Sequence, residues 1–191
     1  MVVFDTSVLT LAFDPTAKAP IDPATGVVLV DAQARIDHLI KTLAATKERV
    51  VIPTPVLSEY LVRGGADRDK RLNEITTSKV FVVAPFDTRA AVECAAIEAG
   101  GPRRNRNLTE EETKAKVKFD RQIIAIAIVR GASVIYTGDR KLAATARLNG
   151  VRAVLTWELE LPPADPQLEL SYEANEAGEV QKSLTEEWGS Y

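Results

Sequence analysis

Cysteine, histidine and aromatic residues are scarce in this chain of 191 residues. With one cysteine, Cys94, and one histidine, His38, it can form neither an internal disulfide nor a zinc site built from Cys and His. Aromatic residues make up 6% of the sequence, and no aromatic-rich RNA-stacking motif is present. These scarcities exclude disulfide scaffolds and Cys/His zinc enzymes, and they argue against general-base catalysis by histidine.

Long apolar runs and glycine-rich loops are also missing. No stretch approaches the ~18 apolar residues of a membrane span, and the start MVVFDTSVL lacks the basic and apolar regions of a signal peptide. Neither GxxxxGK[ST] nor GxGxxG occurs, which argues against the common nucleotide-binding loops. We therefore expect a soluble cytoplasmic protein without a membrane partner.

The chain does have enough apolar residues for one folded domain, since 46% of them are hydrophobic and the net charge is only −3. The charge is unevenly distributed. Residues 162–191 carry seven acids and one base, a net charge of −6, which leaves +3 for residues 1–161. We expect a globular domain over 1–161 and an acidic C-terminal extension over 162–191, which either regulates access to the functional site or mediates assembly, including a homodimer.

Basic residues cluster in one segment of the body. A surface of this kind can bind the phosphates of a polyanion, although it is also what an ordinary solvated face looks like. The candidate RNA-binding residues are Arg103, Arg104, Arg106, Lys114, Lys116 and Lys118.

Short β-branched runs alternate with longer segments of helical periodicity, a pattern typical of β-α units around a mainly parallel sheet. Strands are predicted at Val2 to Phe4, Arg49 to Ile52, Val80 to Ala84, Ser133 to Tyr136 and Arg152 to Leu155. Helices are predicted near 27–46, 55–63, 66–78, 87–99, 109–130 and 140–149, and a proline-rich loop near 14–26. The fold class is therefore α/β.

Two aspartates follow predicted strands of this sheet. Asp5 comes directly after Phe4, and Asp139 follows Tyr136 through Thr137 and Gly138. Ligands bind outside the carboxyl ends of the strands in open parallel sheets, so both carboxylates are candidate site residues. Each is also in a position where an aspartate commonly caps the following helix, and the two roles are compatible.

Two further acids lie on predicted helices. Asp120 falls in the apolar stripe formed by residues such as Ile124 and Ala127, where an unpaired carboxylate is costly to bury. A metal ion or a salt bridge to arginine would each offset that cost. Glu59 lies about one turn into the helix after VIPTP, beside Val56 and Tyr60, and as a lone residue it is equally compatible with a solvent-facing position.

Taken together, four acids from four segments near one edge of the sheet are better explained by a shared role. Mg²⁺ and Mn²⁺ prefer oxygen ligands, and converging carboxylates can bind them while leaving coordination sites for water and phosphate. Such a site suits phosphodiester hydrolysis. A phosphatase of the haloacid dehalogenase type is disfavoured, because it needs a second acid where this chain has Ser7.

The ordered set VVFDTSVL, VIPTPVLSEYL, FDRQIIAIAIVRGASVIYTGDRKL and VRAVLTW resembles the PIN-domain ribonucleases, including the VapC-type toxins of toxin–antitoxin pairs. The resemblance covers residues 1 to about 157. It implies a three-layer α/β/α sandwich with a mainly parallel central sheet. The catalytic and metal-binding residues that it implies are Asp5, Glu59, Asp120 and Asp139, with Thr6, Ser7 and Thr137 as secondary participants.

The resemblance also implies a function: an endoribonuclease dependent on Mg²⁺ or Mn²⁺ that hydrolyses single-stranded or structured RNA. A role as the toxin of a toxin–antitoxin pair, with an antitoxin protein as partner, is compatible with it. The longer chain weakens the toxin interpretation more than the nuclease interpretation. The alternative is a catalytically weak PIN-fold module that binds RNA or protein.

If the basic segment contacts phosphates, RNA affinity should fall with rising salt, with a log–log slope of about −0.7 per neutralised phosphate on single strands. Replacing Arg103, Arg104 and Arg106 together by Ala should flatten that slope in filter-binding titrations. An unchanged slope would mean that the segment is a solvated face.

Overall fold

The computed structural model describes residues 1–100 and 114–163, and Met1–Leu161 form one compact unit. Pro162–Tyr191 form a second unit, of which residues 164–191 lie outside the described part. Three predicted RNA-binding residues, Arg103, Arg104 and Arg106, also lie outside it. The roles of the basic segment and of the acidic extension therefore stay predictions.

The centre of the fold is a five-stranded sheet whose paired strands are all parallel. Its strands are β1 (Val2–Phe4), β2 (Val50–Pro53), β3 (Phe81–Ala84), β4 (Val134–Thr137) and β5 (Arg152–Leu155), in the order β3-β2-β1-β4-β5. All five were predicted to within one residue at each end. The central strand β1 is buried throughout, as expected for a parallel sheet covered on both faces.

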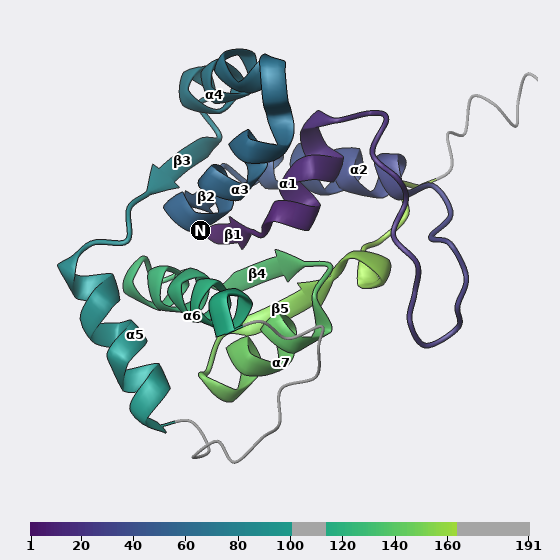
Figure 1. Cartoon of the computed structure of the whole chain (residues 1–191). Helices are drawn as coiled ribbons and strands as arrows, with labels where there is room; N and C mark the ends of the chain where they lie inside the picture. Colours follow the sequence, from purple (N-terminus) through teal and green to yellow (C-terminus); the bar gives the residue numbers. More distant parts are fainter. Residues whose placement is uncertain (101–113, 164–191) are drawn as a thin grey trace, which may run out of the picture. The chain divides into compact units, whose positions relative to one another are not determined.

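Helices flank this sheet, which confirms the predicted α/β sandwich; in Figure 1, α1 to α4 gather on one side of the strands and α5 to α7 on the other. They are α1 (Thr6–Phe13), α2 (Ala32–Ala45), α3 (Thr54–Gly64), α4 (Arg68–Thr77), α5 (Thr88–Gly100), α6 (Lys114–Val129) and α7 (Arg140–Leu148). The described residues also form two 3-10 helices, η1 (Gly65–Asp67) and η2 (Thr156–Glu158). None of the described helices is both long and apolar enough to cross a membrane.

The start of one predicted helix is wrong. The helix expected over 27–46 begins at Ala32, because Asp31 has the left-handed φ of 55° and precedes it as the N-cap residue. The residues before Asp31 belong instead to the loop that follows α1. Within that loop, Ile21 and Val28 form an antiparallel bridge.

Glycines end the helices that lead into β4 and β5. Gly131 follows α6 with φ 63°, and Gly150 follows α7 with φ 79°, a conformation that glycine adopts without steric strain. The next residue along the chain then donates back into the last helical turn, Ala132 N–H to Ala127 O and Val151 N–H to Ala146 O. These turns return the chain to the sheet.

The strand order creates a switch point between β1 and β4. The chain leaves β1 toward β2 and leaves β4 toward β5, so the connections run in opposite directions from these neighbours. In such sheets the crevice at the carboxyl ends of the two strands is where ligands bind. Phe4 pairs with Tyr136 in the register, which places Asp5 beside Thr137 at that crevice.

Candidate functional site

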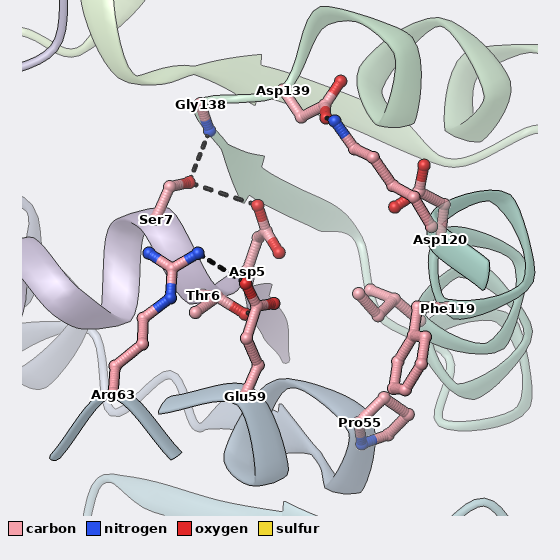
Figure 2. Close-up of a pocket in the computed structure, with 12 residues that line it drawn as sticks. Asp5, Thr6, Ser7, Pro55, Glu59, Arg63, Phe119, Asp120, Gly138 and Asp139 are labelled. Carbon is pink, nitrogen blue, oxygen red and sulfur yellow. Dashed lines mark hydrogen bonds and ion pairs between the residues drawn. The ribbon is translucent and has the colours of Figure 1, made fainter. Parts of the chain in front are cut away.

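A pocket of about 580 Å³ lies at the switch point, and all four predicted acids line it (Figure 2). They come from four places: the end of β1, helix α3, helix α6 and the residue that precedes α7. The lining residues are Asp5, Thr6, Ser7, Pro55, Glu59, Arg63, Lys116, Phe119, Asp120, Ile123, Gly138 and Asp139. The structure thus brings together the acids that the sequence scatters over 135 positions.

Asp5 is the most deeply buried of these acids, with 8% of its surface exposed. Its Oδ2 accepts a hydrogen bond of 2.8 Å from the Thr137 hydroxyl and one of 3.1 Å from Ser7 Oγ. Ser7 Oγ in turn accepts the N–H of Gly138 at 2.8 Å, as Figure 2 shows. Burial raises the pKa of Asp5 above its ordinary value, and the hydrogen bond from Thr137 only partly offsets this.

The capping hydrogen bond considered for Asp5 is not found: Asp5 precedes α1 as its N-cap residue, but its side chain makes no capping hydrogen bond, and its contact with α1 is the hydroxyl of Ser7. For Asp139 the capping role is confirmed: Oδ1 accepts the N–H groups of Lys141 at 2.7 Å and Leu142 at 3.2 Å. The backbone N–H of Asp139 also donates to Thr137 Oγ1 at 2.9 Å. One hydroxyl therefore connects the two aspartates.

Asp139 forms an ion pair through its second oxygen, Oδ2, which lies 2.6 Å from Lys116 Nζ. Burial opposes ionisation of Asp139, but the hydrogen bonds from Lys116 and the helix amides outweigh it, so the pKa of Asp139 is lowered. The same hydrogen bond raises the pKa of Lys116. A protein cation thus occupies one face of the acid cluster.

Glu59 reaches the pocket from α3. Its Oε2 accepts the Thr6 hydroxyl at 2.8 Å, and its Oε1 lies 2.6 Å from Arg63 NH2, one helical turn further along (Figure 2). Glu59 is solvent-exposed, as the alternative considered for it expects, with 48% of its side chain accessible. The contacts with Thr6 and Arg63 nevertheless hold its carboxylate at the pocket, and the sequence does not show the contact with Thr6, 53 residues earlier.

Asp120 carries the least compensated charge. Burial, followed by repulsion from Asp139 and Asp5, raises its pKa to about 7, and Lys116 only partly opposes the shift. The neighbouring Ile123 and Ile124 are buried, as predicted for the apolar face of α6. No salt bridge involving Asp120 is present within the described residues, so the arginine pairing considered for it is not found there.

The donor set fits a hard divalent cation. It consists of carboxylate and hydroxyl oxygens, and the carboxylates repel one another in a partly buried pocket, which added positive charge would relieve. As the side chains stand, no group of three or more Asp, Glu, His or Cys residues in the described chain is arranged around one metal position. Lys116 and Arg63 instead supply the positive charge.

The two basic side chains of this pocket, Lys116 and Arg63, are not predicted as pocket residues from the sequence. Lys116 was assigned only to the basic RNA-binding segment, yet it lies in the pocket on Asp139. Arg63 was not singled out. Helical spacing is a signal that could have found both, because Lys116 lies four residues before Asp120 and Arg63 four residues after Glu59, and side chains so spaced share a helix face.

Comparison with known proteins identifies the fold. The family model of the PIN domain matches residues 25–148, which include Glu59, Asp120 and Asp139 and begin after Asp5. Among solved structures, VapBC2 from Rickettsia felis, bound to a DNA fragment from its promoter, is similar with a TM-score of 0.54 and 11% identity, over 81% of this chain and 98% of that chain. DNA-bound VapBC from Salmonella typhimurium is similar with a TM-score of 0.50 and 18% identity, and the match covers 81% of this chain and 97% of that chain. A search of curated proteins found no match.

The raised pKa of Asp120 predicts how the stability of the metal-free protein depends on pH. Because the pKa of Asp120 in the folded state, about 7, lies above its ordinary value of 3.8, the folded state binds more protons than the unfolded state between these values. Stability should therefore rise as pH falls from 8 toward 5. Asp120→Asn should raise the Tm at pH 8 in EDTA, by about 2–4 °C for each kcal/mol gained in the free energy of unfolding. The same variant should make the stability depend less on pH.

Differential scanning fluorimetry across this pH range measures the effect. The matched control is Asp37→Asn, which changes an exposed carboxylate on α2 outside the pocket. A lower Tm for Asp120→Asn than for the unmodified protein at pH 8 would contradict the repulsion described here.

Proposed function

The chain belongs to the PIN-domain family, and from this premise we propose that it is an endoribonuclease that uses Mg²⁺ or Mn²⁺ to hydrolyse phosphodiester bonds of single-stranded or structured RNA. The observation that carries the proposal is the convergence of Asp5, Glu59, Asp120 and Asp139 on one pocket at the switch point of the sheet. The described residues lining that pocket include no histidine or cysteine. The acids are therefore its candidate catalytic groups.

A divalent cation held by these carboxylates would lower the pKa of a bound water and neutralise charge on the phosphate. Asp5 and Asp139 are the proposed principal ligands, because hydrogen bonds from Thr137, Ser7 and the amides of α7 orient them. Asp120 completes the set directly or through a water molecule.

Glu59 has a positioning role in this proposal. Thr6 and Arg63 hold its two carboxylate oxygens, so its side chain is directed before substrate arrives. Arg63 and Lys116 place positive charge at the pocket, where a scissile phosphate would bind. Lys116 must leave Asp139, at least in part, for that carboxylate to bind a cation through Oδ2.

We propose an antitoxin protein as a further partner. The similar solved structures are VapBC assemblies, and the likeness to this chain extends over most of it, although at low identity it supports the shared fold alone. With such a partner, the chain would be the toxin of a toxin–antitoxin pair. This proposal rests on the shared fold and on the proposed nuclease site together.

A binding module with weak or no catalytic activity is the second candidate. The observation that favours it is that protein cations already pair with two of the acids, Lys116 with Asp139 and Arg63 with Glu59. Such a pocket could bind a partner without cleaving it.

Cleavage assays separate the two functions. Purified protein should cut single-stranded RNA with Mg²⁺ or Mn²⁺, and EDTA should abolish the reaction. Asp5→Asn should lower kcat by roughly 100-fold or more, the scale seen when one group that stabilises transition-state charge is removed. Gel analysis of labelled RNA measures the rate.

Asp37→Asn is again the matched control and should leave the rate unchanged. Full activity of Asp5→Asn, or cleavage that survives removal of metal, would contradict the proposed nuclease site. RNA binding without cleavage under any metal would identify the binding module instead.

A further inference from the structure

A second pocket of about 310 Å³ adjoins the acid cluster and shares Lys116, Gly138 and Asp139 with it. Its remaining walls come from three other segments: the loop between α1 and α2, the start of α7, and η2. The residues they contribute are Ile21, Pro23, Arg140, Lys141 and Trp157. Its volume is at the lower end of the roughly 300–1,000 Å³ typical of pockets for small ligands.

The two pockets differ in charge. Four acids and two bases line the acid pocket, whereas the lining of the second has three bases, Lys116, Arg140 and Lys141, and the single acid Asp139. A phosphodiester chain is repelled by the first pocket until cations bind there, but it is attracted by the second. The second pocket therefore suits the part of a nucleic acid next to the reacting phosphate.

Trp157 provides an aromatic side chain at a fixed place in the lining of the second pocket. It lies in η2, directly after β5 and thus at the same edge of the sheet as Asp5 and Asp139. Its neighbour Glu158 accepts the N–H of Leu155 at 2.9 Å and pairs with Arg147 at 3.5 Å, and Thr156 is buried. These contacts hold the short turn, so Trp157 is positioned without a ligand.

The proline-rich loop between α1 and α2 provides a further part of the lining. The Ile21–Val28 bridge orders it, together with hydrogen bonds from Asp22 N–H to Val27 O and from Leu29 N–H to Pro20 O. This loop places Ile21 and Pro23 at the pocket. Apolar side chains and a tryptophan in the lining of a basic pocket combine the features that bind a base and its phosphate.

We propose that this second pocket is a nucleotide subsite, in which Trp157 stacks on the base adjoining the scissile phosphate and Arg140 and Lys141 contact its phosphate. The proposal rests on the proposed ribonuclease function for the identity of the ligand as RNA. It assigns to this chain's loop and η2 a role in binding the substrate strand.

Binding of a short single-stranded RNA tests the subsite in the full chain, in Mg²⁺ buffer, with Asp5→Asn present to prevent cleavage. The chain has two tryptophans, so Trp188→Phe leaves Trp157 as the only one. RNA should quench its fluorescence in a saturable way. Trp157→Leu should weaken binding by roughly 5- to 150-fold, the range for loss of one stacked base, whereas Trp157→Phe should retain most of the affinity.

The phosphate contact is tested by salt dependence. Arg140→Ala should reduce the magnitude of the log–log salt slope by about 0.7. The matched control is Arg152→Ala, because Arg152 is exposed at the start of β5, the opposite end of that strand from Trp157. Arg140 is likewise exposed on α7, so its replacement leaves the core intact, and the Tm of each variant checks its folding.

The outcomes separate this proposal from the nuclease proposal. If the unmodified protein cleaves RNA but Trp157→Leu binds as tightly as Trp157→Phe, the subsite is wrong and the nuclease stands. If the protein cleaves no RNA but Trp157 is quenched and the two variants differ, the subsite stands and the nuclease is wrong. Quenching of Trp157 by a peptide of residues 164–191 that carries Trp188→Phe, but not by RNA, would overturn the subsite in favour of a protein ligand.

Discussion

The hydrogen bond from the Thr137 hydroxyl to the Asp5 carboxylate is the contact on which the site depends. It joins the carboxyl ends of β1 and β4, the two strands between which the chain reverses its winding. The same hydroxyl accepts the N–H of Asp139, while Ser7 connects Asp5 to Gly138. The parallel pairing of Phe4 with Tyr136 sets this register, so the sheet itself orients two carboxylates toward one pocket.

The acids have an electrostatic consequence for the whole domain. Burial raises the pKa values of Asp5 and Asp120, which means that their ionised forms oppose folding at neutral pH. Lys116 and Arg63 offset part of this by pairing with Asp139 and Glu59. Such uncompensated charge is retained in a protein when a ligand uses it, and functional sites are where perturbed carboxyl groups concentrate. The divalent cation proposed for this pocket would satisfy these oxygen donors.

Local patterns in the sequence predict much of this architecture. The β-branched runs locate all five strands, and the position of Asp139 directly before a helix predicts its capping bonds. Two predictions about helix starts failed. Asp5 makes no capping hydrogen bond to α1, and its Oδ2 instead accepts hydrogen bonds from Thr137 and Ser7. The left-handed conformation of Asp31 places the start of α2 at Ala32, later than predicted. Lys116 looked like one member of a basic segment, since nothing local shows that Asp139 lies within reach of its ammonium group.

Anomalous diffraction from crystals soaked in Mn²⁺ would show whether the four carboxylates hold a divalent cation, as we propose. We expect an anomalous peak at coordination distance from Asp5 and Asp139, with Asp120 bound to it directly or through water and with Lys116 displaced from Asp139. Crystals that show no peak in this pocket, and in which Lys116 remains paired with Asp139, would contradict the proposal.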